Sequence, residues 1–335
     1  MPRKARVDAA GTFHHIMARG IDRCRIFRND RDLEDFLRRL SLILPATHTR
    51  CFAWALMPNH VHLVLKTGDV PIAEVMRRLL TGYAVSFNRR YRRNGHIFQN
   101  RYKSILCDEE PYLLQLVRYV HLNPVRANLA EGMAGLDKYH YCGHSALLGK
   151  HTRDWQDTET VLRRFSHKRS VARQRYHRFI QKGLTQGKRD DLIGGGLVRS
   201  AGGWSAVQAM RRTDAVYASD ERMLGDGPFV ERVLREVQER MEHGLMLHAL
   251  GVTLETITRR VAEVTGCPEE EVQRPGKNPP RVRARSLLCY WAVRELGMSQ
   301  SDLGRRLNLS SAGVSLSVRR GEELAQQLGC KLLER

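Results

Sequence analysis

The order of strand-like and helix-like segments over residues 12–107 is the feature that most restricts the fold of this chain. Four segments alternate or run apolar as strands do, at residues 12–18, 50–57, 60–66 and 96–107. Two segments between them, 30–45 and 72–91, repeat apolar residues at helical spacing. The resulting order, β-α-β-β-α-β, predicts an α+β fold in which helices cover one face of an antiparallel sheet.

The chain after this unit is expected to be helical. Asp108, Glu109 and Glu110 followed by Pro111 are typical of the first turn of a helix, and Pro124 stops that helix near Asn123. A basic stretch from 150 to 200 and a segment of mixed charge at 228–248 also have helical patterns. We therefore expect three regions: 1–148 as the α+β domain, 149–250 as a basic helical linker region, and 251–335 as a C-terminal domain.

The C-terminal region has the signals of a helix-turn-helix. Ser299 and Asp302 form a capping pattern before a short helix that ends at Leu307. A turn at Asn308 then leads into a second helix over 311–320. This arrangement predicts binding to duplex DNA, and a plain helical bundle is the alternative reading.

The net charge points to an anionic partner. Lys and Arg number 56 against 36 Asp and Glu, which gives a formal net charge of +20. Such a charge favours polyanions through counterion release, and nucleic acid is the expected partner. The chain has no apolar run of the roughly 20 residues that a membrane-spanning helix needs, and seven scattered cysteines fit reduced thiols. We expect a cytoplasmic, nucleoid-associated protein with no membrane partner.

Two histidines mark the candidate site. His60 and His62 are two residues apart in the strand-like run 60–66, so their side chains point to the same face of the sheet. Neutral imidazoles held side by side are good ligands for a divalent metal. Two hydrogen-bonded histidines at a strand edge are the alternative reading.

The helix before Pro124 offers further groups. Tyr119 and Asn123 are four residues apart and share one helical face. An amide oxygen from Asn123 with two imidazoles suits Mg²⁺ or Mn²⁺ and does not exclude Zn²⁺ or Co²⁺. Tyr119 would then stand beside the metal as a phenol able to attack. Taken singly, Tyr119 could also be a packing residue and Asn123 a helix cap.

These residues resemble a known family. The segment MPNHVHLVL (57–65) resembles the His-hydrophobic-His motif of the single-tyrosine HUH transposases, and RYVHLNPVRA (118–127) resembles the tyrosine helix of their REP-associated branch. Residues 18–27 and 95–104 also fit that branch, so the resemblance covers about 8–148. It implies an RRM-like (ferredoxin-like) HUH catalytic core, usually a homodimer, that cuts and rejoins single-stranded DNA near hairpins or REP-like sequences. It also implies His60, His62 and Asn123 as metal ligands, and Tyr119 as the nucleophile that forms a 5′-phosphotyrosine.

The C-terminal segment 254–321 resembles the DNA-binding domain of the bacterial replication initiator DnaA. It departs from that family where the base-reading signature would stand, because this chain has SSAGVS at 310–315. Duplex binding is implied, but the sequence preference of the initiator is not. Candidate DNA-contacting residues in the two outer regions are Arg19, Arg23, Arg89, Arg90, Arg101, Lys103, Ser311, Ser315 and Arg319.

The sequence thus predicts a metal-dependent single-strand DNA transposase that acts through a covalent intermediate. The main alternative is a DNA-binding regulator with little or no activity that relies on the helix-turn-helix. An RNA-binding RRM is disfavoured because the strands lack an aromatic-rich pattern. A hydrolase that uses water would share the histidines but form no protein–DNA adduct.

Overall fold

A computed structural model describes residues 11–333 except 69, 187–188, 190–191 and 193–221. The chain divides into two compact units, Met1–Arg232 and Val233–Arg335. The expected boundaries at 148 and 250 differ from this division, and the functional assignment of the three expected regions stays a prediction.

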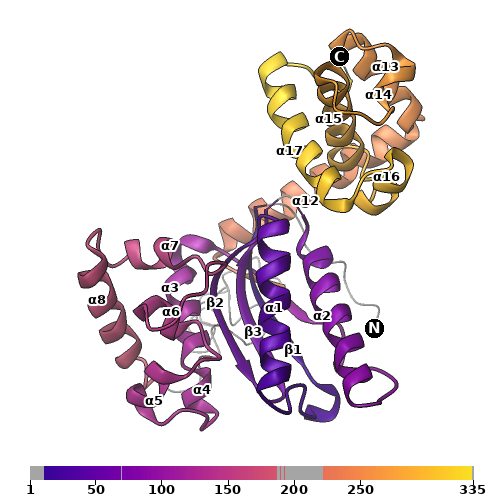
Figure 1. Cartoon of the computed structure of the whole chain (residues 1–335). Helices are drawn as coiled ribbons and strands as arrows, with labels where there is room; N and C mark the ends of the chain where they lie inside the picture. Colours follow the sequence, from indigo (N-terminus) through magenta and orange to yellow (C-terminus); the bar gives the residue numbers. More distant parts are fainter. Residues whose placement is uncertain (1–10, 69, 187–188, 190–191, 193–221, 334–335) are drawn as a thin grey trace, which may run out of the picture. The chain divides into compact units, whose positions relative to one another are not determined.

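A mixed sheet forms the centre of the first unit (Figure 1). Its strands lie in the order β2-β3-β1-β4-β5. The strands are β1 (Phe13–Arg19), β2 (Arg50–Met57), β3 (His60–Lys66), β4 (Lys103–Cys107) and β5 (Met223–Leu224). The first four pair antiparallel, as predicted, while β5 is a short strand that adds parallel to β4.

Two helices cover one face of this sheet. Helices α1 (Asp30–Ala46) and α2 (Ile72–Arg90) pack over it, with Phe36, Leu79 and Tyr83 fully buried among the strand residues. The Asn29 side chain caps α1 by accepting a hydrogen bond from the Asp32 backbone N–H. The β-α-β-β-α-β order and the α+β fold class are therefore confirmed.

The opposite face of the sheet is covered as well. Helix α3 (Glu109–His121) places Leu116, Val117 and Val120 in a core that includes Phe52 and Val64 from the strands. Alternate residues of one strand point to opposite faces, so β3 serves both cores. Helix α3 thus packs over β2 and also contacts β3, the strand that carries the histidine pair.

Between α3 and residue 181, a range that the structure describes in full, five helices follow. They are α4 (Asn123–Arg126), α5 (Gly132–Lys138), α6 (His144–Leu148), α7 (Thr158–Arg163) and α8 (Arg169–Gln181). Val161, Tyr176 and Ile180 from α7 and α8 are fully buried in the same core as α3. The stretch from 150 to 181 thus packs onto the sheet unit and contributes to its core.

The second unit is helical. It contains α13 (Leu254–Thr265), α14 (Glu269–Val272), α15 (Pro279–Arg294), α16 (Gln300–Leu307) and α17 (Ser311–Leu328), and α12 (Gly227–Ala249) runs through the division at residue 232. A β-carbon at Gly304 would lie only 2.7 Å from the Leu309 carbonyl oxygen, so the turn between α16 and α17 requires glycine there. Asn308 adopts the left-handed conformation at this turn. The two helices predicted at 299–307 and 311–320 are present, and α17 is longer than predicted.

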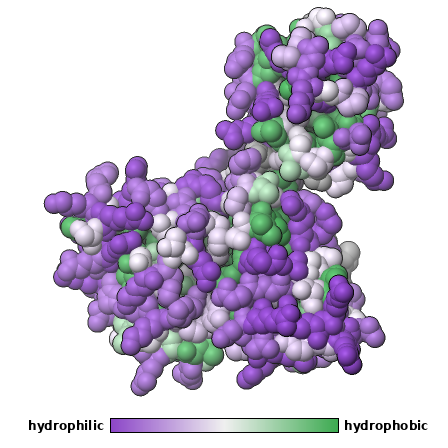
Figure 2. All heavy atoms as spheres, viewed as in Figure 1, coloured by the Kyte–Doolittle hydropathy of each residue, from purple (hydrophilic) through white to green (hydrophobic). Residues whose placement is uncertain are grey.

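One predicted strand is shorter than expected. Residues 96–102 form a loop, and β4 begins only at Lys103. Backbone hydrogen bonds from Ile21 to Ile97 and from Gln99 to Arg19 hold this loop against the end of β1. Figure 2 shows that hydrophilic residues dominate the visible surface, with apolar residues in scattered groups. Within the described part of the chain, no helix is long and apolar enough to cross a membrane.

Candidate active site

The predicted histidine pair lies side by side on β3. The ring centroids of His60 and His62 are 5.2 Å apart. In the antiparallel register with β1, His60 lies opposite Arg19 and His62 lies opposite Met17. His62 is buried and His60 is half-buried, so the pair lies at the edge of the protein surface and not deep in the core.

A third histidine, which the sequence reading missed, joins this pair. His15 on β1 is fully buried, and its Nε2 atom lies 3.0 Å from Nδ1 of His62. The two rings stack with centroids 5.3 Å apart. His15 is two residues before Met17, so it points to the same face as the pair. The sequence alone does not reveal this residue, because only the pairing of β1 with β3 brings His15 beside His62.

Tyr119 packs against these imidazoles from α3. Its ring centroid is 5.7 Å from that of His15 and 5.9 Å from that of His62, and both contacts are edge-on. The side chain is half-buried. The sheet and the helix therefore bring together the predicted nucleophile and the predicted histidines.

The side chain of Asn123 is hydrogen-bonded to the end of α3, an interaction that its predicted role as a metal ligand does not require. It is the first residue of α4, and its Nδ2 atom donates to the Tyr119 carbonyl oxygen at 3.0 Å and to that of Val120 at 3.4 Å. Among the described residues, no hydrogen bond joins Asn123 to an imidazole. Its Nδ2 atom is thus tied to the end of α3, and no described residue donates a hydrogen bond to its side-chain Oδ1 atom.

The environment keeps the histidines neutral. Burial, and then the nearby positive charge of Arg19, lowers the pKa of His60 to about 4. Burial also holds the pKa of His62 well below its usual value, with further contributions from His15 and His60. Neutral imidazoles retain a lone pair that can bind a cation.

Hydrogen bonds select which ring nitrogens remain available. Nδ1 of His60 lies 2.6 Å from the Asn59 side-chain oxygen, and Nδ1 of His62 is engaged by His15. Nε2 is left on both rings as the nitrogen for a ligand. Within the described residues, no group of three or more His, Cys, Asp or Glu side chains could hold a metal. Two imidazoles with the Asn123 amide oxygen stay the predicted donor set.

A cation lies next to Tyr119, the predicted nucleophile. The Arg126 guanidinium stands 5.3 Å from the centre of the Tyr119 ring, and it also donates to the Tyr119 carbonyl oxygen at 3.4 Å. Burial lowers the pKa of Arg126, the charge of Tyr119 raises it, and repulsion from Arg189 lowers it further. No ion pair with an acidic side chain of the described residues neutralises Arg126. The sequence reading did not single out this arginine.

The predicted DNA-contacting residues fall into different environments. Arg19, Arg23, Arg89, Arg101, Lys103 and Arg319 are exposed. Arg90 instead forms ion pairs with Asp32 and Asp35, both of which are buried, so its charge is already used inside the domain. Ser315 is only 2% exposed, so its hydroxyl is buried in this structure. The side chain of Ser311 lies outside the described residues.

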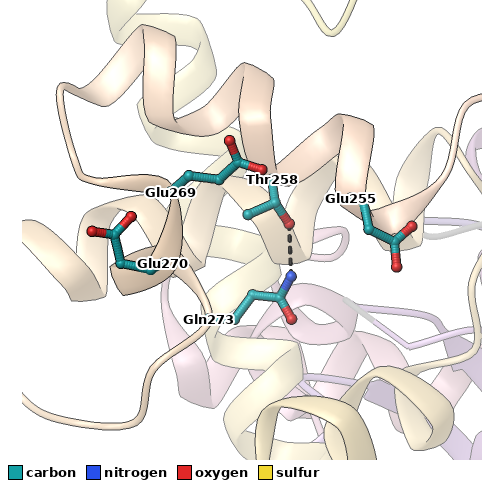
Figure 3. A pocket seen from close by; sticks show the side chains of 5 residues that line it. All are labelled: Glu255, Thr258, Glu269, Glu270 and Gln273. Atoms are coloured by element: carbon teal, nitrogen blue, oxygen red, sulfur yellow. Dashed lines mark hydrogen bonds between the residues drawn. The ribbon is translucent and has the colours of Figure 1, made fainter.

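The structure also contains two pockets apart from the histidine cluster. One, of about 870 Å³, lies between α2 and the 95–102 loop and is lined mainly by apolar side chains such as Met76, Leu80 and Phe98. The other, of about 410 Å³, lies on α13 and α14 in the second unit. Figure 3 shows that Glu255, Glu269 and Glu270 surround the bond from Gln273 to Thr258 in that pocket. Its acidic lining is unsuited to DNA phosphates.

Comparison with known proteins finds similarity over one part of the chain. Residues 10–123 match the sequence model of the IS200-like transposase family. A solved structure of a REP-associated tyrosine transposase bound to a REP hairpin is similar at 15% sequence identity and a TM-score of 0.37. The similarity covers 47% of this chain and 94% of that one. No curated protein matches the chain.

Proposed function

We propose, from the premise that residues 10–123 are a transposase domain of the IS200-like family, that this chain cuts and rejoins single-stranded DNA through a covalent bond to Tyr119. The observation that supports this most directly is the packing of Tyr119 against His15 and His62. A phenol and a set of neutral imidazoles on one side of a sheet are the groups that such a reaction requires.

The covalent step requires no reactant other than Tyr119 and the DNA strand. The Tyr119 oxygen attacks the scissile phosphorus and forms a new P–O bond, while the bond from phosphorus to the 3′ oxygen breaks. The phenol loses its proton and the departing 3′ oxygen gains one. One phosphodiester replaces another, so a 3′-hydroxyl can later reverse the step and rejoin the strands. The 5′-phosphotyrosine polarity follows from the sequence resemblance.

We also propose that His60, His62 and Asn123 would hold a divalent metal. Both imidazoles have Nδ1 engaged and Nε2 available, and the Asn123 amide is oriented by the helix end. A mixed nitrogen and oxygen donor set suits Mn²⁺ or Mg²⁺. When bound, such an ion would polarise the phosphate as a Lewis acid.

Two residues of this chain assist the nucleophile in our proposal. Arg126 places a positive charge beside the Tyr119 ring, which stabilises negative charge on the phenol oxygen as its proton leaves. His15 holds His62 in a fixed orientation, as the outer partners of ligating histidines do.

The DNA partners are proposed from the sequence motifs and the surface charge. Single-stranded DNA flanking a hairpin is the proposed substrate, and exposed Arg19, Arg23 and Arg101 are proposed to contact its phosphates. A homodimer is proposed from the same motifs. In the second unit, exposed Arg319 and Arg320 on α17 are proposed to contact duplex DNA, away from the acidic pocket of α13 and α14.

The test is the formation of an adduct. The full chain is incubated with Mn²⁺ and labelled single strands that contain a hairpin, and the products are separated in SDS. We expect a stable protein–DNA adduct for the wild type and for Tyr112→Phe, a matched control on the same helix, and none for Tyr119→Phe. Peptide mapping of the adduct to another tyrosine would refute the assignment, and cleavage without an adduct would favour a water-using hydrolase.

A further inference from the structure

A chain of buried hydrogen bonds connects the nucleophile helix to the helices that follow the family domain. His121 is the last residue of α3, two residues after Tyr119, and it is fully buried. Its Nδ1 atom lies 2.8 Å from the hydroxyl of Tyr176, which is also fully buried. Tyr176 belongs to α8, well beyond residue 123, where the family match ends.

This series of hydrogen bonds continues from Tyr176 to the carboxylate of Asp137. The Tyr176 hydroxyl also lies 2.7 Å from Nδ1 of His144, and Nε2 of His144 lies 2.9 Å from an oxygen of Asp137. Burial opposes ionisation of Asp137, but hydrogen bonds from His144 and Lys150 lower its pKa. Burial lowers the pKa of His144 to about 4, so this imidazole is neutral.

The Asp137 carboxylate determines which group donates in each of these hydrogen bonds. An ionised Asp137 can only accept, so Nε2 of His144 donates to it and Nδ1 of His144 accepts. The Tyr176 hydroxyl then donates to His144, and its oxygen accepts from the Nδ1–H of His121. Each hydrogen bond has one consistent donor, and the end of α3 is thereby fixed to α5, α6 and α8.

This attachment lies close to the chemistry. His121 stands between Tyr119 and Asn123 along the chain, and the three residues end one helix and begin the next. Displacement of His121 would move the ring of Tyr119 relative to His15 and His62, which are fixed on the sheet. Apolar packing of Tyr176 against α3 would not by itself fix the position of the Tyr119 ring, because apolar contacts are not directional.

We propose that Tyr176 is a positioning residue: its hydroxyl, held by Asp137 through His144, fixes His121 and so orients Tyr119 for attack on DNA. The catalytic unit therefore extends through α8, and residues 149–181 are more than a linker. This inference rests on the proposed function, since the reaction at Tyr119 is the one that it orients.

The test compares two buried tyrosine hydroxyls. Tyr176→Phe removes the hydroxyl from the chain of hydrogen bonds. The control, Tyr83→Phe, removes a fully buried hydroxyl that donates to the Ile26 carbonyl on the other face of the sheet. Three quantities are measured for the full-length variants: amide hydrogen exchange over 109–126, the Kd for a single-stranded oligonucleotide, and the single-turnover rate of adduct formation at saturating oligonucleotide.

We expect Tyr176→Phe to speed exchange at the end of α3 by about tenfold or more, and to slow adduct formation by about 10- to 100-fold, with the Kd unchanged. Tyr83→Phe should leave exchange over 109–126 at the wild-type level and slow the reaction far less. This split between rate and affinity separates positioning from general loss of structure. Unchanged exchange in Tyr176→Phe, or equal slowing in both variants, overturns the inference while the wild-type adduct still supports the proposed function. Absence of any wild-type adduct overturns the proposed function itself, and exchange alone then reports whether the attachment exists.

Discussion

Nε2 of His15 lies 3.0 Å from Nδ1 of His62, and this contact joins the first strand of the sheet to the strand that carries the candidate metal ligands. The two rings are nearly parallel, with an interplanar angle of 23°. Such a contact fixes both the rotamer of His62 and the nitrogen that it presents. We therefore expect His15 to orient His62 without being part of the proposed donor set.

Replacing His15 should weaken metal binding. We expect His15→Ala to lower the affinity for Mn²⁺ by about 10- to 100-fold, as the loss of an outer partner of a ligating histidine typically does. Titration calorimetry of the full chain measures this directly. His14→Ala is the matched control, because His14 is also fully buried on β1 but bonds to Thr12 and Ser104 instead. Equal loss of affinity in both variants would argue against a specific role for His15.

Stability should fall in mild acid because buried histidines resist protonation. Burial lowers the pKa values of His14 and His144 to about 4, from an ordinary value of about 6.5. Between these two values the unfolded chain binds more protons than the folded one, so the free energy of unfolding decreases as the pH falls from 6.5 to 4. Urea denaturation at a series of pH values tests this. His14→Gln should show a shallower decrease over the same range, and an unchanged slope would contradict the assignment to His14.

Removing the cation beside Tyr119 should slow the covalent step. Arg126→Ala is expected to reduce the rate of adduct formation by about 10- to 100-fold, because its positive charge beside the Tyr119 ring favours loss of the phenol proton. Arg126→Lys retains the charge but loses the planar group over the ring, so an intermediate rate is expected. Single-turnover kinetics at saturating oligonucleotide measure both. Arg118→Ala serves as the control, since that guanidinium lies over Phe179 and not over Tyr119. A rate for Arg126→Ala equal to that of the control would exclude this role.

The sequence predicted the local elements well because each has its own periodicity. The strand at 60–66 has the bounds that were predicted, and the helices at 30–45 and 72–91 were placed within one residue. The strand at 96–107 was predicted too long, because the apolar residues Ile97 and Phe98 read as strand. They pack instead in a loop that bonds to the end of β1, and this contact between distant segments has no local signal.

The candidate site was predictable only in part, for a related reason. His60, His62, Tyr119 and Asn123 lie in short motifs whose spacing shows which side chains share a face. His15, Arg126 and Tyr176 reach the site through strand pairing or helix packing, which local patterns do not reveal. For Arg90 and Ser315 the environment could not be read from the sequence, because helical spacing does not show which partners a side chain meets. Arg90 is paired with Asp32 and Asp35, and Ser315 is buried in the core of its unit.

The last prediction concerns duplex DNA and the second unit. Arg319 and Arg320 are exposed on α17, and the ion pair that Arg319 forms with Glu323 at 3.4 Å is itself exposed and contributes little. If both contact phosphates, the double variant Arg319→Ala/Arg320→Ala should lower duplex affinity and reduce the slope of log K against log[salt] by about 2, since each phosphate contact contributes about 0.9. The adduct on a short single strand should form at the wild-type rate, because the nucleophile belongs to the other unit. Fluorescence anisotropy over a range of salt concentrations measures the slope.

As a control, Arg259→Ala/Arg260→Ala removes two arginines of α13, on the helix that lines the acidic pocket. The same drop in slope for both pairs would mean that duplex DNA responds to net charge alone and that α17 has no specific role.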